Sequence, residues 1–202
     1  MSLFPMFLKL EGRTCLVVGA GSVGEPKIRS LLQAKAEVRV IAPHVTAIVA
    51  AWADAGILTW HRRNFVSQDL EGAFLVVAAT NSRDVNEDVF REAQHRKILC
   101  NTVDDPQHCD FYYPAVVRRG ELQFAISTGG RSPALAQRLR RELEAQFSPE
   151  YAGWVDELGN ARKKLQACDL QPEVKKRQLH ELASQEAFEA AHQPTRETSH
   201  ER

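Results

Sequence analysis

The sequence predicts an α/β fold in which a parallel sheet is followed by a β-hairpin and a helical C-terminal region. As far as Val103, short apolar runs rich in β-branched residues alternate with stretches of helical periodicity, which is typical of parallel strands joined by helices. After Val103 the alternation stops, and two β-rich runs are followed only by helical stretches. We therefore expect a first domain over residues 1–113, a hairpin segment over 114–147 and a helical region with a polar tail over 148–202.

The elements of the first half follow from their apolar patterns. The run from Thr14 to Val18 is continuously apolar and ends in glycines, as in a fully buried parallel strand. The stretch after it places Ile28, Leu31 and Leu32 at helical spacing. By the same reasoning we expect strands at Thr14–Val18, Glu37–Ile41, Leu58–Arg62, Ala73–Ala79 and Ile98–Val103, and helices at Ser22–Gln33, Val45–Ala55 and Asp84–His95.

The second half reads as one hairpin and a set of helices. Serine is a good N-cap and proline suits the first helical position, so Ser132-Pro133 predicts the start of a helix that ends near Phe147. An isolated hairpin is marginally stable, which indicates that it packs against another copy of the chain. We expect β-runs at Phe111–Val117 and Leu122–Ser127 with a turn at Arg118–Glu121, further helices from Ser148 and after Pro172, and a frayed tail at Gln193–Arg202.

Composition argues against several classes of function. The 26 basic and 26 acidic side chains balance, whereas nucleic-acid-binding proteins usually carry a basic excess. No stretch approaches the roughly 18 consecutive apolar residues of a membrane span, and Met1–Pro5 does not resemble a signal peptide. The four cysteines form no CxxC pair and the seven histidines no HExxH motif. We therefore expect a reduced cytoplasmic protein without a protein-bound metal, a nucleic-acid partner or a membrane.

The segment Gly19–Gly24 has the pattern GxGxxG, and it directly follows a buried strand and opens a helix. The first glycine allows a tight turn, the second lets a pyrophosphate approach the backbone, and the third permits close packing of helix on strand. The N–H groups at the helix start then bind phosphate charge. The motif predicts a Rossmann domain that binds a nicotinamide dinucleotide, the alternative being a glycine-rich turn without a ligand. The expected contacts here are Gly19, Gly21, Ser22, Val23 and Gly24.

Two further strand ends are expected beside the dinucleotide, because ligands of open α/β sheets lie beyond the carboxyl ends of the strands. The second strand usually ends in a carboxylate that binds the ribose. This chain has no acid there, and Arg39 and His44 are the polar side chains nearby, so NAD and NADP both remain open. The fourth strand ends in small residues, for which a plain strand-to-helix turn is the alternative. The expected contacts at these two ends are Ala42, Pro43, Thr80 and Asn81.

Two carboxylates, Asp104 and Asp105, follow the last predicted strand of the sheet. A carboxylate at this edge could accept a proton or orient a substrate N–H group. Asp before Pro106 is also common in turns, so simple turn chemistry is the alternative.

A second candidate binding segment precedes the helix that starts at Ser132-Pro133. Glycines, hydroxyls, a helix N-terminus and arginines together suit an anionic ligand. A capped helix with a solvated charged face is the alternative, which Glu142 and Glu144 favour. The candidate ligands are Thr128, Gly129, Gly130, Arg131, Ser132 and Arg138.

The ordered set of motifs resembles the precorrin-2 dehydrogenase family, which includes the N-terminal part of siroheme synthase. The resemblance runs from Phe4 to Phe147, and the helical remainder fits more loosely. Siroheme synthase continues into a methyltransferase domain, so the stand-alone form is expected here. The matching residues are Phe4–Phe7, Leu10, Cys15–Gly21, Val23, Lys27, Ala78–Thr80, Cys100, Asn101, Val103, Asp104, Phe111, Pro114 and Gly129–Ala136.

The resemblance implies that NAD accepts a hydride from precorrin-2, which also loses a proton to give sirohydrochlorin in siroheme biosynthesis. Some members also insert ferrous iron, and cobalt is a possible alternative metal substrate. Asp104 would act as general base or position the macrocycle, and Arg131 and Arg138 would meet some of the eight carboxylates of the substrate. Thr128 occupies the position of a serine that is implicated in regulation of the substrate site in some members of the family. The family's intertwined homodimer implies that the hairpin of residues 111–127 pairs across a two-fold axis.

Two other functions compete with this one. Regulatory Rossmann domains of potassium transporters carry a similar glycine loop and bind nucleotides without catalysis, but they usually have an acid at the end of the second strand, where this chain has Ala42. They also lack the Gly-Gly-Arg-Ser-Pro turn. A chelatase that no longer oxidises its substrate is the third possibility.

Overall fold

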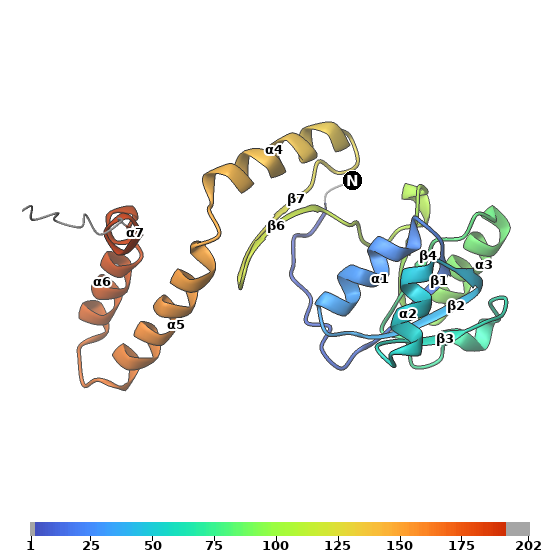
Figure 1. Cartoon of the computed structure of the whole chain (residues 1–202), viewed down its shortest axis with the longest axis horizontal. Helices are drawn as coiled ribbons and strands as arrows, with labels where there is room; N and C mark the ends of the chain where they lie inside the picture. Colours follow the sequence, from blue (N-terminus) through green and yellow to red (C-terminus); the bar gives the residue numbers. More distant parts are fainter. Residues whose placement is uncertain (1–2, 193–202) are drawn as a thin grey trace, which may run out of the picture. The chain divides into compact units, whose positions relative to one another are not determined.

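The computed structural model describes residues 3–192, which form two compact units that divide between Tyr113 and Pro114 (Figure 1). The first unit is built on a five-stranded parallel sheet with the strand order β3-β2-β1-β4-β5. Its strands are β1 (Thr14–Ala20), β2 (Glu37–Val45), β3 (Thr59–His61), β4 (Leu75–Ala78) and β5 (Leu99–Thr102), and its helices are α1 (Gly24–Gln33), α2 (Ala47–Asp54), α3 (Arg83–His95) and the 3-10 turns η1 (Ser67–Leu70) and η2 (Pro106–His108).

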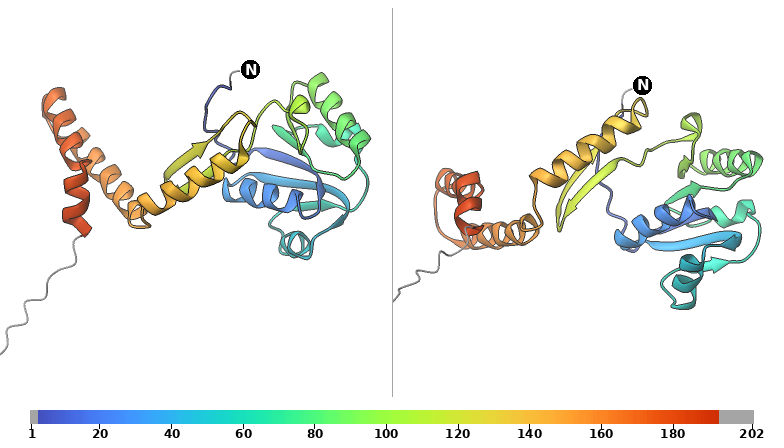
Figure 2. Two further views of the ribbon diagram at one scale, coloured as in Figure 1. Left: turned by 90° about the horizontal axis from the view of Figure 1, so that it is seen from above. Right: turned by 45° about the horizontal axis from the view of Figure 1, so that its top comes forward.

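Both faces of the sheet are covered, which confirms the predicted doubly covered α/β fold (Figure 2). On one face, Ile28 of α1 and Val49 of α2 join a core with Val17 of β1. On the other face, Val89 of α3 packs with Leu16 of β1. Each of these side chains is fully buried, so β1 lies at the centre of the unit, and the strand order reverses beside it. A ligand site of an open α/β sheet is expected at such a reversal.

Strand β2 extends further than its apolar pattern predicts. It continues to Val45, which pairs with Ala20, and the register between β1 and β2 shifts between Val18 and Ala20. This irregularity surrounds Gly19, whose φ of 89° is a conformation that favours glycine. The helix predicted from Val45 therefore begins at Ala47, because Thr46 is extended and caps it. The start predicted for the first helix was also early, since α1 begins at Gly24.

The second unit consists of an antiparallel hairpin and four helices. Helix α4 packs on both strands of the hairpin, and α5 packs on β7 and α6 (Figures 1 and 2). The elements are β6 (Ala115–Arg119), β7 (Leu122–Ile126), α4 (Pro133–Gln146), α5 (Tyr151–Ala167), α6 (Pro172–Leu182) and α7 (Gln185–His192).

The hairpin differs from its prediction at both ends of β6. Residues up to Tyr113 belong to the first unit, where the Asn101 side-chain amide donates to the Phe111 carbonyl at 2.8 Å. At the other end Arg119 pairs with Leu122, so the turn is the two residues Gly120-Glu121 and the arginines belong to the strand. Gly120 has a φ of 57°, a value that suits a tight hairpin turn.

The helical region after Pro172 contains two helices where the sequence indicated one. Ser184 separates them, and its Oγ accepts from the N–H of Ala187 at 3.1 Å, which is the geometry of an N-cap. The buried hydrophobic residues of the second unit are Val117, Ala136 and Tyr151, and aromatic side chains pack around Tyr151. Tyr151 stacks on Phe188 with a centroid distance of 4.1 Å, and Phe124 meets Phe147 at 4.5 Å. The polar tail predicted at 193–202 lies outside the described residues.

Candidate functional site

The glycine loop joins β1 to α1 with the geometry that its pattern predicts. A Cβ on Gly19 would lie 2.5 Å from the Ala79 carbonyl oxygen, so only glycine fits between β1 and β4. A Cβ on Gly24 would collide with the Gly19 carbonyl, so Gly24 allows α1 to start close against the loop. A Cβ on Gly21 would meet no atom within 4 Å. The backbone at Gly21 is therefore open to an approaching ligand.

A cavity of about 600 Å³ lies at the carboxyl ends of β1, β2 and β4. Helix α1 begins at its edge and has no side-chain cap. The Glu25 N–H donates to the Gly21 carbonyl at 3.0 Å, and Pro26 has no N–H, so backbone donors for an anionic ligand would come from the segment Ser22–Gly24. Of the predicted cofactor residues only Gly24 is absent from the cavity wall. Those that line the cavity are Gly19, Gly21, Ser22, Val23, Ala42, Pro43, Thr80 and Asn81.

The cavity wall also contains residues that the sequence reasoning missed. Arg63, Asn64 and Phe65 follow β3 and close one side of the cavity, and Val85 and Asp88 contribute from α3. The rule that ligands lie beyond strand ends applies to β3 as much as to β2 and β4. It would have indicated residues 63–65 had it been applied to the predicted third strand.

Arg39 of β2 and Arg63, which follows β3, are both hydrogen-bonded to other parts of the protein. The Arg39 guanidinium donates to the Asp69 and Glu71 carbonyls, each at 2.9 Å, so it does not simply face solvent. Arg63 donates two hydrogen bonds to the carboxylate of Asp69, at 2.7 Å and 2.5 Å. Burial of Asp69 opposes its ionisation, but the bonds from Arg63 and from the Val66 N–H prevail and lower the pKa of this carboxyl. Asp69 is therefore an ionised partner that holds Arg63 against the cavity.

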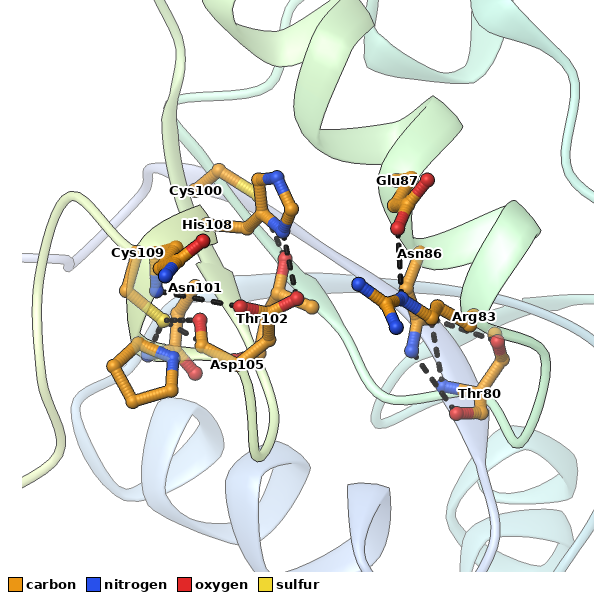
Figure 3. Close-up of polar contacts among 12 residues, drawn as sticks. Thr80, Arg83, Asn86, Glu87, Cys100, Asn101, Thr102, Asp105, His108 and Cys109 are labelled. Carbon is orange, nitrogen blue, oxygen red and sulfur yellow. Dashed lines mark hydrogen bonds and ion pairs between the residues drawn. The ribbon is translucent and has the colours of Figure 1, made fainter.

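The turn after β4 is held by a side-chain network rather than by backbone bonds alone (Figure 3). The side-chain oxygen of Asn86, a residue buried on α3, accepts from the Thr80 N–H at 3.2 Å and from its hydroxyl at 2.7 Å. The Asn86 amide nitrogen donates to the Thr80 carbonyl at 3.1 Å. This fixes the part of the cavity wall that carries Thr80 and Asn81.

The two carboxylates after β5 differ in their surroundings. Asp105 caps η2, accepts from the Gln107 N–H at 3.3 Å and lies 2.7 Å from His108 Nδ1. The hydrogen bond to His108 lowers the pKa of Asp105. Asp104 is exposed, has a φ of 59°, and its carboxylate has no hydrogen bond or ion pair within residues 3–192. Asp105 is thus the turn residue of the pair, and Asp104 is the one free to meet a ligand.

The Cys109 thiol forms hydrogen bonds with the turn that contains Asp104. Its thiol lies 3.1 Å from the Thr102 carbonyl and 3.2 Å from the Asp105 carbonyl, one on each side of Asp104 (Figure 3). The Asn101 amide donates to the same sulfur at 3.4 Å. Burial raises the pKa of the Cys109 thiol, so it remains a protonated donor in this turn.

A smaller cavity of about 180 Å³ lies beside this turn. Its wall contains Asp104 and Asp105 from the turn, Tyr112 and Tyr113 from the segment that follows, and Lys27 from α1. The dinucleotide cavity and this smaller cavity therefore belong to the same unit and occupy the carboxyl edge of the same sheet.

The segment predicted to bind an anion lies in the second unit, between β7 and α4. Gly129 and Gly130 have φ values of 61° and 78°, and the Thr128 hydroxyl accepts from the Ser132 N–H at 3.1 Å. Ser132 caps α4, as predicted. Arg138 lies 3.6 Å from Glu142 on the exposed face of α4, as the alternative of a solvated helix face requires. The role of this segment in substrate binding stays a prediction.

No helix in residues 3–192 combines the length and the apolar character that crossing a membrane requires. In the same residues no three side chains of His, Cys, Asp or Glu are grouped so that they could hold a metal ion.

A Rossmann sheet with a GxGxxG loop that opens on a cavity at the strand reversal defines the class of dinucleotide-binding domains. The family described as "Putative NAD(P)-binding" matches residues 6–115, and the family "Sirohaem biosynthesis protein central" matches residues 119–146. The structure is similar to that of SirC, a precorrin-2 dehydrogenase, with a TM-score of 0.78, 30% identity and 91% coverage of both chains. The chain therefore belongs to the precorrin-2 dehydrogenase and siroheme synthase family, as the resemblance of its motifs indicated.

Curated relatives carry the same family name. The chain is 41% identical over 168 residues to siroheme synthase 1 of Aeromonas hydrophila, a match that covers 83% of the chain and 36% of that protein. It is 42% identical over 145 residues to siroheme synthase of Photorhabdus laumondii, with coverage of 72% and 31%. The chain thus spans about a third of the length of these relatives.

Proposed function

We propose that this chain oxidises precorrin-2 to sirohydrochlorin with NAD, as a step of siroheme biosynthesis. The observation that carries the proposal is the free carboxylate of Asp104, which lies at the same sheet edge as an open dinucleotide cavity. The similarity to a precorrin-2 dehydrogenase over 91% of both chains supports the choice of substrate. A nucleotide sensor would need the dinucleotide cavity, but it would not need a carboxylate that accepts a proton, which is the role proposed for Asp104.

The residues around the cavity fit a dinucleotide. Gly21 leaves the space that a pyrophosphate needs, and the start of α1 supplies the positive end of the helix dipole. The bound NAD would supply the hydride acceptor. Gly19, Thr80 and the backbone around them would hold it at the sheet edge, with the nicotinamide directed toward the macrocycle.

The oxidation releases one hydride and one proton from precorrin-2. Bound NAD would accept the hydride, and we propose that the Asp104 carboxylate accepts the proton. An exposed carboxylate with no protein partner can rotate toward the macrocycle and return its proton to water afterwards. The turn held by Cys109 keeps the Asp104 backbone in place while this happens.

We expect the chain to bind NAD at least about tenfold more tightly than NADP. The 2′-phosphate of NADP requires a cation. Arg39 is already hydrogen-bonded to the carbonyls of Asp69 and Glu71, and Arg63 to the carboxylate of Asp69. His44 is the remaining basic group on the cavity wall. Calorimetric titration of both nucleotides at low and physiological salt measures this preference. Equal binding, or tighter binding of NADP, would show that Arg63 leaves Asp69 for the phosphate.

We also propose that two chains form a homodimer through residues 114–147, with the helices of residues 148–192 completing the assembly. The β6–β7 sheet has only two strands, so each strand has an edge without a partner among the described residues. Light scattering after size exclusion at micromolar concentration is expected to give twice the 22.7 kDa mass of one chain. A monomer under those conditions would contradict the proposal.

Within such an assembly, Thr128, Gly129, Gly130, Arg131, Ser132 and Arg138 are proposed to bind carboxylates of the substrate. The arginines supply charge, and the two left-handed glycines lie in an exposed turn in which the Gly129 N–H donates to the Ser127 hydroxyl at 3.2 Å. The cytoplasmic location expected from the sequence also stays a prediction.

The test of the proposed function is an anaerobic assay in which precorrin-2 is generated in situ and its absorbance is followed with NAD or NADP. Conversion to sirohydrochlorin with NAD is the expected result. If neither nucleotide supports conversion although NAD binds tightly, the chain is a sensor or a chelatase. Ferrous or cobalt ions, added afterwards as substrates, test whether the same protein inserts a metal into sirohydrochlorin.

A further inference from the structure

Lys27 is the basic side chain that lines the smaller cavity beside Asp104. It belongs to the first turn of α1 and follows the glycine loop by three residues. It does not line the dinucleotide cavity, whose wall takes Gly21, Ser22 and Val23 from the same segment. The glycine loop that precedes α1 therefore lines the dinucleotide cavity, whereas Lys27 of α1 lines the smaller cavity.

The Lys27 ammonium has no protein partner of opposite charge at close range. Within residues 3–192, Lys27 is absent from all ion pairs, whereas Arg29 on the same helix pairs with Glu25 at 2.9 Å. Its nitrogen instead lies 3.9 Å from the centre of the Tyr113 ring. The Tyr113 ring packs against the main core of the first unit, so its position beside the ammonium is fixed.

A half-buried ammonium of this kind is costly unless an anion meets it. Burial lowers the pKa of Lys27. The negative charge of Asp104 opposes this shift, but the two side chains form no ion pair in the described residues. The ring of Tyr113 contacts one side of the ammonium, so its remaining N–H groups are available to a ligand in the cavity. A carboxylate is the group that satisfies an ammonium best in such a site.

We infer that Lys27 binds a carboxylate of the tetrapyrrole substrate and thereby holds the macrocycle beside Asp104. The inference rests on the proposed function, because it takes the ligand to be a polycarboxylate macrocycle. It adds a substrate contact from the dinucleotide-binding unit to those proposed on the segment between β7 and α4. Since Asp104 must meet the carbon or nitrogen that loses the proton, a fixed anchor in the same cavity wall sets the orientation of the ring.

The test compares Lys27→Met with Lys27→Arg in the full chain. Methionine keeps the unbranched stem and its packing on Tyr113 but removes the charge, and arginine keeps the charge. Lys9→Met, at an exposed position of the same unit, is the matched control. Three quantities are measured for each protein: KM and kcat for precorrin-2, the Kd of NAD, and the Kd of sirohydrochlorin followed by the absorbance of the macrocycle.

The expected result is that Lys27→Met raises both KM and the Kd of sirohydrochlorin about tenfold, as the loss of one charged hydrogen bond does. We expect kcat and the Kd of NAD to stay within about twofold, and Lys27→Arg and Lys9→Met to resemble the wild type.

Three outcomes would overturn the inference. Unchanged sirohydrochlorin binding in Lys27→Met would show that Lys27 only packs on Tyr113. A fall in kcat with unchanged KM would assign it to the proton transfer, and equal losses for NAD and macrocycle would assign it to the structure of α1. If the wild type neither binds sirohydrochlorin nor oxidises precorrin-2, the proposed function itself fails, which the variants alone would not show.

Discussion

Asp104→Asn is expected to lower the turnover of precorrin-2 by a factor of about 10² to 10⁴, the usual contribution of a general base. Asparagine is nearly the same size as aspartate and tolerates the φ of 59° at this position at least as well. The Asp104 side chain makes no hydrogen bond within the described residues, so its replacement leaves the turn intact. The change therefore removes the proton acceptor, together with the negative charge that acts on Lys27, without disturbing the turn. The kcat under saturating precorrin-2 and NAD measures the effect on proton transfer.

The control for this prediction is Asp105→Asn. Asp105 accepts from Gln107 and faces His108, so its replacement is expected to lower the thermal unfolding temperature more than kcat. The Kd of NAD should be unchanged in both variants, because neither residue lines the dinucleotide cavity. Normal turnover in Asp104→Asn would make Asp104 a turn residue, and the catalytic assignment would then be wrong.

Gly21→Ala is expected to weaken the binding of NAD without destabilising the fold, whereas Gly19→Ala is expected to destabilise the fold itself. At Gly21 the added methyl group meets no atom of the protein, so the folded state is preserved, but the methyl occupies the approach of the pyrophosphate. We expect at least about a tenfold increase in the Kd of NAD, or more than about 1.4 kcal/mol of lost binding free energy. Titration with NAD, together with the unfolding temperature of the free protein, measures both properties.

At Gly19 the methyl group has no space in the folded protein itself. It would lie 2.5 Å from the Ala79 carbonyl oxygen, on a residue whose φ is 89°. We expect Gly19→Ala to reduce the free energy of unfolding by about 3 kcal/mol or more, since overpacking and backbone strain add together. Gly12→Ala is the matched control, because its φ is also positive but its Cβ would be free of contacts. A Gly19→Ala protein as stable as this control would contradict the observed approach of β1 to β4.

Much of the site could be predicted because it depends on local sequence. The GxGxxG pattern lies between one strand and one helix, and Gly24 serves a contact within that segment. The contact that requires Gly19 is with Ala79, which is distant in sequence. Thr80 and Asn81 follow from the rule that strand ends line the ligand cavity. The role of Asp104 came from the resemblance of motifs, and its position at the edge of β5 agrees with that role.

Other parts could not be predicted because they depend on residues far apart in the chain. The extension of β2 to Val45 follows from the irregular register opposite Gly19, which the apolar pattern of β2 does not encode. The late start of β6 follows from the bond between Asn101 and Phe111, which keeps that segment with the first unit. Apolar periodicity reports which face of a segment is buried, but it does not report where a neighbouring segment ends the pairing.

The sequence by itself determined the alternating α/β order, the dinucleotide loop and the membership of the family, since each depends on the spacing of residues along one stretch of chain. Only the tertiary structure decided which polar side chains remain available to a ligand. Arg39 and Arg63 are bound to the η1 segment, Asp105 is committed to its turn, and Asp104 and Lys27 are left facing one cavity. The reason is that a charged side chain meets whichever partner the folded chain brings within a few ångströms, and that partner has no fixed separation in sequence.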